Sequence, residues 1–354
     1  MNGKRHKVRP LLSLLLLLSL LAGCAGGSAP AAEPIEEVPA VEEPETVEPV
    51  QEEPEAALPY AYPLTGVPTE ERATDRPIVV MVENSPAARP QTGLHEADIV
   101  YEVLAEGDIT RFIAVYHSVK AEEIGPVRSI RPYFVQLGME IDGILVHAGW
   151  SQEAMNMMAK HKWNHLDQVY GDHDYYWRDK SRKAPHNLYT SIELVRKGAE
   201  KKKFRNTWTD PILTFAGAGA AAPVGEPATR ATIPYIRGYE AGYEYDEASR
   251  TYLRTMAGKP HNDKKTGERL AASNVLVVEA KHRIVDDVGR REVDVLGPGK
   301  GVLLQAGVRR DIVWELKNGM IRAYDKEGAI TDIPLLPGKT WVQIVPDVSK
   351  VDIT

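Results

Sequence analysis

The chain has 354 residues, with 43 Lys and Arg against 50 Asp and Glu, which gives a formal net charge of −7. Its 43% hydrophobic and 26% charged residues are typical of a globular protein and exclude a mostly disordered chain. The charge is uneven, because residues 31–60 contain ten Glu and no Lys or Arg, whereas residues 1–23 contain four basic residues. The rest of the chain is almost neutral, which argues against nucleic-acid binding through a strong basic field.

The first 23 residues are predicted to be a lipoprotein signal peptide. A basic stretch ending at Arg9 precedes the apolar segment Leu11–Leu21, which is too short to span a bilayer comfortably. The segment ends in Leu21-Ala22-Gly23-Cys24, which resembles a bacterial lipobox, and Cys24 is the only cysteine. We therefore expect a palmitate-type lipid anchor on Cys24 and a location at the extracytoplasmic face of the cell membrane. The alternative is an ordinary signal peptide or a buried thiol.

Composition divides the rest of the chain into a stalk and two domains. Residues 24–60 are rich in Glu and Pro and predict a disordered stalk. Residues 216–230 are rich in Gly, Ala and Pro without periodicity and predict a linker. The expected fold class is α+β, with an N-terminal α/β domain with a mixed sheet over residues 61–215, followed by a smaller mainly-β domain over residues 231–354.

Strands and helices alternate in the first predicted domain, whereas short strands dominate the second. Short β-branched runs between turn residues predict strands at 77–83, 97–105, 110–117 and 143–147. Apolar periodicity predicts helices at 132–141, 151–162 and 191–203. In the second domain, strands are predicted around 239–246, 250–256, 274–280, 301–305, 310–316, 320–324 and 340–345.

Several charged residues fall in a predicted hairpin of the first domain. The run Glu106-Gly107-Asp108-Ile109 suggests a turn with Gly-Asp at its tip. This turn places Leu104 opposite Arg111 and puts Glu102 on the same face of the hairpin. Glu102 then lies close enough to Arg111 for a partly buried ion pair. A purely structural salt-bridge network explains these charges equally well.

Two arginines precede the predicted helix 132–141. Pro132 suits the first helical position, so Arg128 and Arg131 crowd the positive end of the helix, where they do not favour stability. With the backbone N–H groups of the helix they predict a site for a phosphate or carboxylate group. The alternative is that Glu102 or Glu106 neutralises them internally. His147 joins this predicted site, because it closes an otherwise apolar strand at the end where α/β proteins bind ligands.

Other polar clusters have structural explanations. Ser151 is expected to cap the following helix and is not predicted to be a nucleophile. His161 and His165 have the spacing of a metal pair, but the predicted helix ends near residue 162, and no metal site is predicted. The aromatic run 175–177 suits either sugar stacking or packing onto the sheet. His261 and Asp263 lie in a loop whose turn-forming composition accounts for them.

Longer motifs resemble the YerB-like lipoprotein family of Gram-positive bacteria. They are RPQTGLHEADIVYEVLAEGDITRFIAVY, IGPVRSIRPYF, VHAGWS, APHN and PGKTWVQIVP, spread over residues 60–350. The resemblance implies an exported lipoprotein with two consecutive domains and a family function that is unknown, and it implies no reaction. It also marks polar positions without an established role, which are Glu83, Asn84, Arg89, Gln91, Glu102, Glu106, Thr110, Arg111, Arg128, Ser129, Arg131, His147, Ser151, Arg178, His186 and Asn187.

The runs ADIVYEV, ITRFIAVYHSV and RSIRPYFV are also faintly similar to LytR-CpsA-Psr phosphotransferases. Those enzymes bind polyprenyl pyrophosphate with arginines and a magnesium-bound aspartate, and they attach glycopolymers to peptidoglycan. This chain departs from their pattern, because Arg131-Pro132 replaces an arginine-aspartate pair and Ala97-Asp98 stands where an acid after Ser is expected. Magnesium is implied only under this alternative, with Asp98 and Glu102 as its candidate ligands.

The expected function is that of a cell-envelope binding module for an anionic ligand, with Arg111, Arg128, Arg131, His147 and Glu102 in its site. One alternative is a phosphotransferase of the LytR-CpsA-Psr type acting on polyprenyl-linked glycopolymers, and a second is an envelope scaffold protein. The sequence leaves open whether the protein is an enzyme, and it identifies no cofactor. The expected partners are the membrane, through Cys24, and a glycopolymer or protein of the envelope, without nucleic acid.

Overall fold

The computed structural model describes residues 58–209, 213–325 and 332–354, all within one compact unit. The predicted signal peptide, Cys24 and the stalk up to residue 57 lie outside the described residues. Within the described ranges no helix is long and apolar enough to cross a membrane.

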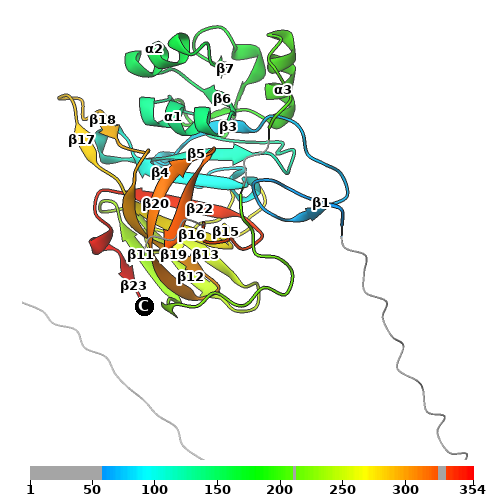
Figure 1. The fold of residues 1–354 in the computed structure, drawn as a ribbon. Helices are drawn as coiled ribbons and strands as arrows, with labels where there is room; N and C mark the ends of the chain where they lie inside the picture. Colours follow the sequence, from blue (N-terminus) through cyan, green and yellow to red (C-terminus); the bar gives the residue numbers. More distant parts are fainter. Residues whose placement is uncertain (1–57, 210–212, 326–331) are drawn as a thin grey trace, which may run out of the picture. The chain divides into compact units, whose positions relative to one another are not determined.

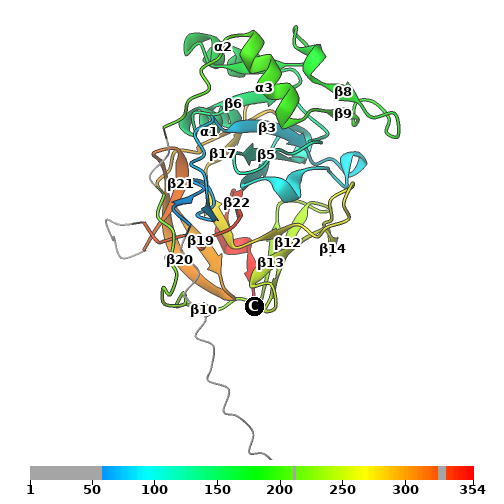
Figure 2. The same ribbon diagram turned by 90° about the vertical axis from the view of Figure 1, so that its right-hand side faces the viewer.

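A mixed sheet of eleven strands runs through the described part of the chain (Figure 1). Its order is β10-β20-β19-β16-β22-β4-β5-β3-β6-β7, with β21 paired to β20. Figure 2 shows the sheet continuing from β6 through β3 and β5 to β22 and β19 without a break. The strands are β3 (Ile78–Glu83), β4 (Ile99–Leu104), β5 (Thr110–Tyr116), β6 (Ile144–His147), β7 (His165–Asp167), β10 (Glu226–Pro227), β16 (Asn274–Glu279), β19 (Gly299–Gln305), β20 (Val308–Lys317), β21 (Met320–Asp325) and β22 (Thr340–Val345).

The smaller elements complete the described fold. A second, six-stranded sheet contains β11 (Arg230–Pro234), β12 (Glu240–Asp246), β13 (Thr251–Met256), β14 (Lys259–Pro260), β15 (Ala271–Ala272) and β23 (Asp352–Ile353). Two-stranded pairs join β1 (Tyr60–Ala61) to β2 (Pro68–Thr69), β8 (Trp177–Arg178) to β9 (Leu188–Tyr189), and β17 (His282–Ile284) to β18 (Arg291–Val293). The helices are α1 (Pro132–Glu140), α2 (Gln152–Lys160) and α3 (Ile192–Lys201), with 3₁₀ turns at Pro86–Ala88, Leu94–Glu96, Glu106–Asp108, His173–Tyr175 and Val348–Lys350.

The main sheet is buried on both faces, which explains why its strands are continuous apolar runs. All six residues of β3 are buried, and its side chains alternate between two hydrophobic clusters. One cluster includes α1 and α2, and the other includes α3 and the six-stranded sheet. Ser151 caps α2 by accepting a hydrogen bond from the Ala154 N–H at 3.4 Å, as the sequence predicts.

The predicted elements agree with the structure to within two residues at each end. The architecture is mostly sheet with few helices, and the main sheet is mixed. Several features were not expected from the sequence, among them the strands β7, β11, β17 and β18. Within the predicted linker 216–230, β10 pairs with β20, and the segments 99–104 and 340–345 lie side by side as the parallel pair β4–β22.

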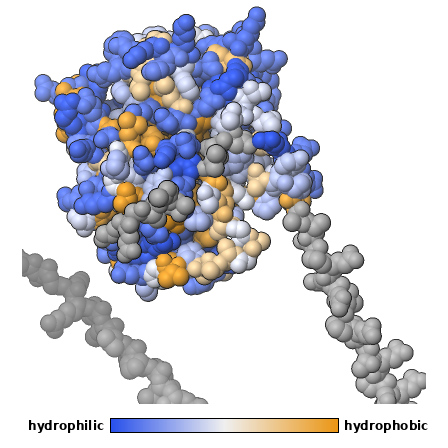
Figure 3. Space-filling model, viewed as in Figure 1, coloured by the Kyte–Doolittle hydropathy of each residue, from blue (hydrophilic) through white to orange (hydrophobic). Residues whose placement is uncertain are grey.

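The surface drawn in Figure 3 is mostly hydrophilic, with hydrophobic residues in scattered patches. Among the described residues, the large hydrophobic side chains that are exposed include Ile284 of β17 and Val288, which lies between β17 and β18. Scattered exposed hydrophobic residues are normal for a protein surface and carry no functional argument by themselves.

Candidate functional site

Six strands of the main sheet end at the same edge. β16, β22 and β4 are mutually parallel, as are β3, β6 and β7, and β5 runs antiparallel between β4 and β3. Their carboxyl ends therefore meet at one edge, where open α/β sheets bind ligands. Glu83 ends β3, His147 ends β6, Asp167 ends β7, and Glu106 closely follows β4. Arg111 is the second residue of β5, which begins at this edge.

The predicted register of the β4–β5 hairpin is wrong by one residue. Leu104 lies opposite Thr110, and Val103 lies opposite Arg111. The cause is a three-residue turn, Glu106–Asp108, in which Gly107 has a left-handed conformation with φ 66° and ψ 28°. A shift of one residue moves every side chain of a strand to the other face.

Glu102 therefore does not pair with Arg111. Its carboxylate binds Arg254 of β13, with 2.6 Å between Oε2 and Nη2, and both side chains are 0% exposed. The other oxygen, Oε1, accepts hydrogen bonds from Thr110 Oγ1 at 2.7 Å and Asn84 Nδ2 at 3.1 Å. Glu102 consequently leaves the predicted anion site and belongs to a polar network between the two sheets.

Arg254 is the residue of this network that the sequence analysis missed. It donates to His261 Nδ1 at 3.0 Å and to the Tyr243 hydroxyl at 2.7 Å, and its guanidinium lies 4.3 Å from the Trp341 ring centroid. A signal was present in the sequence, because Arg254 occupies the same alternating face of β13 as the buried Tyr252 and Met256. A charged residue at such a position indicates a buried partner.

Arg111 and Arg131 converge on Glu106. Arg111 Nη2 lies 3.0 Å from Glu106 Oε1, and Arg131 Nε lies 2.9 Å from Glu106 Oε2. Arg131 also binds Oε1 through Nη2. Burial by itself raises the pKa of Glu106, but the two guanidinium groups outweigh it and lower the pKa from 4.5 to about 2. Glu106, which the sequence analysis named as one alternative, is therefore the internal partner of Arg131.

Among the side chains that the structure describes, the cluster of Arg111, Arg131 and Glu106 carries more positive than negative charge. Two guanidinium groups, those of Arg111 and Arg131, share the one carboxylate of Glu106. Arg111 is 4% exposed, and its buried Nε–H has no hydrogen-bond partner within the described residues. Buried donors normally have a hydrogen-bond partner. The Arg111 Nε–H can therefore donate to a further acceptor, and the positive charge favours an anionic one.

Arg128 has a separate partner. It forms a two-pronged ion pair with Glu83, with Nε at 2.8 Å from Oε2 and Nη2 at 2.9 Å from Oε1. Ser85 Oγ and His186 Nδ1 complete the contacts of the same carboxylate at 2.6 and 2.9 Å from Oε1. Burial raises the pKa of Glu83, but the hydrogen bonds from Arg128, Ser85 and His186 outweigh it, and the net pKa is lowered. Glu83 was marked only by the family resemblance.

The backbone of residues 128–131 links the two arginine groups. Arg111 Nη1 donates to the Ser129 carbonyl at 2.9 Å, and Arg131 is the residue that precedes α1, with Pro132 in the first helical position. The predicted start of the helix is thus confirmed. A cavity of about 660 Å³ lies between the first turn of α1 and the β17–β18 pair, lined by Pro132, Tyr133, Gln136, Lys281, His282, Arg283, Glu292, Val293 and Asp294.

His147 lies at the expected strand end but has no contact with an arginine side chain in the described structure. Its side chain is fully buried, and burial, followed by the neighbouring His165, lowers its pKa to about 3. The Nδ1–H donates to the Gly149 carbonyl at 3.0 Å, so Nε2 accepts from His165 Nδ1 at 3.1 Å. A neutral, buried imidazole adds no positive charge to an anion site.

The candidate magnesium ligands are also occupied. The Asp98 carboxylate is fully buried and accepts hydrogen bonds from the backbone of His117 and Ser118 and from the Ser118 hydroxyl. Glu102 is bound to Arg254 on the opposite face of the sheet from Arg111. Neither acid therefore stands beside the arginines, as a phosphotransferase of the expected type requires. No group of three potential metal ligands occurs in the described ranges.

Comparisons with known proteins identify the family. Residues 64–205 match the family described as "Protein of unknown function (DUF3048) N-terminal domain", and residues 231–342 match its C-terminal domain. The chain is 39% identical over 306 residues to "Putative lipoprotein YerB" of Bacillus subtilis, covering 85% of this chain and 91% of that protein.

The comparison with solved structures identifies a protein of the same name. The crystal structure of the YerB protein from Bacillus subtilis matches with a TM-score of 0.76 and covers 83% of this chain and 99% of that one. The matches confirm the resemblance inferred from the motifs and the two-domain architecture, and the main sheet crosses from one matched domain into the other. The chain therefore belongs to the YerB-like family defined by the N- and C-terminal DUF3048 domains.

Proposed function

We propose that this chain is a lipid-anchored protein of the cell envelope that binds a phosphorylated or carboxylated ligand beside the first turn of α1. One observation carries the proposal: Arg111 and Arg131 share the single carboxylate of Glu106, and Arg111 Nε lacks a partner among the described residues. An anionic group bound there balances the second positive charge and accepts a hydrogen bond from the Arg111 Nε–H.

The location rests on the N-terminal sequence and on the name of the relative. Lipidation of Cys24 places the domains at the extracytoplasmic face of the cell membrane, at the end of the Glu- and Pro-rich segment. In the native host, Cys24→Ser should abolish lipid labelling and give a soluble or uncleaved product, as measured by metabolic labelling with a fatty acid and by membrane fractionation. Unchanged labelling and anchoring of the variant contradict a lipid anchor at Cys24.

A binding module is favoured over a phosphotransferase because both candidate metal ligands are already bound to protein groups. An envelope scaffold is the second candidate. It is favoured by the internal ion pairs of Arg128 with Glu83 and of Arg131 with Glu106, because arginines that serve only the fold are expected to be paired in this way.

The test uses pyrophosphate as the anionic probe and two substitutions with opposite expected effects. Arg131→Lys removes the two-pronged contact and should weaken pyrophosphate binding by about 1–3 kcal/mol in calorimetric titration, the scale of a hydrogen bond to a charged group. Glu106→Gln removes the internal competitor and should tighten binding.

The matched control is Arg205→Lys. Arg205 also binds one carboxylate with its guanidinium, at 2.6 Å from Asp142 Oδ1, but it is half exposed and lies outside the arginine cluster. Arg205→Lys should leave pyrophosphate binding unchanged. If the wild-type chain does not bind pyrophosphate, or if Arg131→Lys binds as wild type does, the anion-binding proposal is wrong and the scaffold is favoured.

A further inference from the structure

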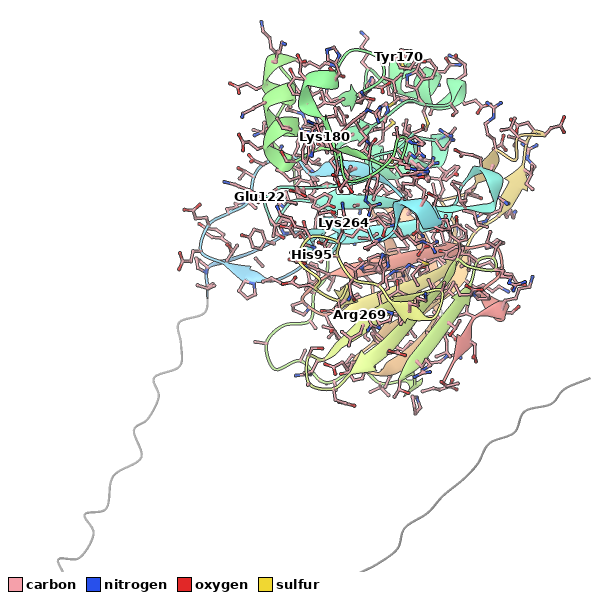
Figure 4. The ribbon with its side chains drawn as sticks, turned by 180° about the vertical axis from the view of Figure 1, so that it is seen from behind. His95, Glu122, Tyr170, Lys180, Lys264 and Arg269 are labelled. Atoms are coloured by element: carbon pink, nitrogen blue, oxygen red, sulfur yellow. The ribbon has the colours of Figure 1, made fainter. Side chains whose placement is uncertain are left out.

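A second cavity lies where the two matched domains meet, away from the arginine cluster. Its volume is about 550 Å³, within the range of about 300–1,000 Å³ that is usual for small-molecule sites. The N-terminal domain contributes Thr92, Glu123, Trp177, Arg178, Asp179, Lys180, Ser181 and Tyr189, and the C-terminal domain contributes Lys264 and Lys265. Lys180 and Lys264 are labelled in Figure 4, and Lys264 Nζ donates to the hydroxyl of Ser181, the residue after Lys180, at 3.0 Å.

The cavity has an aromatic wall. Trp177 of β8 and Tyr189 of β9 are paired across their short ladder, and their rings are stacked at 6.0 Å with an interplanar angle of 26°. Tyr189 is almost fully buried. A half-buried indole beside polar groups is suited to stacking against the C–H face of a sugar ring.

The charged groups around this wall are predominantly positive. Lys264 pairs with Asp179 at 2.6 Å, and Lys265 pairs with Glu123 at 3.1 Å and with the exposed Glu122 at 3.4 Å, so both lysines are neutralised and tie the two domains together. Arg178 is held by the Asn187 amide oxygen at 2.9 Å, which carries no charge. Lys180 is exposed and has no ionic partner within the described part of the chain. The lining therefore carries two positive charges that no described carboxylate neutralises.

We propose that this cavity binds an acidic saccharide, a sugar unit that carries a phosphate or carboxylate group. The ring stacks on Trp177, the anionic group is bound by Arg178 and Lys180, and the carboxylates of Asp179 and Glu123 accept hydrogen bonds from sugar hydroxyls. This site is independent of the anion site proposed beside α1.

The experiment measures binding of N-acetylglucosamine 6-phosphate to the full-length chain by calorimetry, with glucuronic acid as a second acidic sugar. The comparison ligands are N-acetylglucosamine, inorganic phosphate and the dipeptide N-acetyl-Asp-Asp. The sugar phosphate should bind at least tenfold more tightly than N-acetylglucosamine or phosphate alone, because only it engages both the aromatic wall and the cations. Glucuronic acid distinguishes a carboxylate from a phosphate preference.

Two variants test the two halves of the site. Trp177→Ala should weaken binding of the sugar phosphate at least tenfold, and Lys180→Ala should weaken it about fivefold while leaving N-acetylglucosamine binding unchanged. Tyr170→Ala and Lys201→Ala replace an exposed aromatic and an exposed lysine outside the cavity, and they should bind as wild type does. Trp177→Ala should leave pyrophosphate binding unchanged, because Trp177 lines only this cavity, which separates the present site from the one beside α1.

The proposal is overturned if inorganic phosphate or the dipeptide binds as tightly as the sugar phosphate, or if none of the sugars binds. It is also overturned if Lys180→Ala, whose exposed side chain is not needed for folding, has the same effect on the neutral and the charged sugar. If Trp177→Ala does not fold, Trp177→Phe replaces it and should weaken binding less than tenfold.

Discussion

Two charged clusters near the turn of the β4–β5 hairpin differ in how completely their charges are matched. Glu102 and Arg254 form one pair, both side chains are 0% exposed, and their remaining polar atoms bind Asn84, Thr110 and Tyr243. Glu106, which is only four residues further along the chain, is shared by Arg111 and Arg131 at the rim of the sheet. The first cluster has one cation for one anion, and the second has two cations for one anion.

The difference distinguishes a network whose charges are fully paired from the cluster for which we propose ligand binding. A buried charge is tolerated only when its partner and hydrogen bonds are complete, which makes the Glu102 network part of the contact between the two sheets. A surplus guanidinium with a free N–H has a cost to the folded state that an anionic ligand removes. Both clusters contain Glu and Arg. They are distinguished by whether every donor and acceptor has a hydrogen-bond partner.

The largest expected effect is on the buried cluster. Glu102→Gln leaves the Arg254 charge unpaired in the core and should lower the free energy of unfolding by about 3–5 kcal/mol in denaturant titration. The double variant Glu102→Gln/Arg254→Met removes the charge as well and should recover much of the loss. A loss below about 1 kcal/mol for the single variant shows that the network does not stabilise the contact between the sheets.

A smaller effect, which depends on pH, is expected at Glu106. Because its pKa is lowered from 4.5 to about 2, its contribution is fully present above pH 4.5 and is lost as the pH falls toward 2. The contribution is at most about 3 kcal/mol, from the size of the shift. Thermal unfolding of wild type between pH 5 and pH 2 should therefore be steeper in pH than that of Glu106→Gln. Parallel pH profiles for the two proteins contradict the shared ion pair.

The smallest expected effect is on the turn that sets the register. Gly107 has φ 66°, and a Cβ added there meets nothing within 4 Å, so Gly107→Ala strains only the backbone. The unfolding free energy should fall by about 1 kcal/mol, without loss of pyrophosphate binding. The control is Gly258→Ala, at φ 71° in the turn between β13 and β14, where an added Cβ also meets nothing within 4 Å. Abolished anion binding in Gly107→Ala indicates that the register has shifted and that the arginines have separated from Glu106.

Local patterns predicted the elements well. Apolar runs without alternation located β3, β4 and β5, and Pro132 located the first residue of α1, because these signals depend on neighbours in the chain. The binding site itself stays a prediction, and its predicted residues do not form one cluster. Arg111 and Arg131 share Glu106, whereas Arg128 pairs with Glu83. Glu102 faces the second sheet, and His147 pairs with His165. The error in register came from one left-handed glycine, which converts a two-residue turn into a three-residue turn.

The sequence by itself determined the family and the order of the longer strands and helices, and it predicts an export signal, because motifs and periodicity are properties of contiguous residues. Only the tertiary structure decided that β4 pairs with β22 and that Glu102 meets Arg254, partners separated by 152 residues. Such pairings depend on which buried surfaces and charges are complementary after the chain has closed long loops, and no local pattern records that choice. These pairings also decided that Glu102 is fully paired in the core, whereas Glu106 is shared by two arginines at the edge of the sheet.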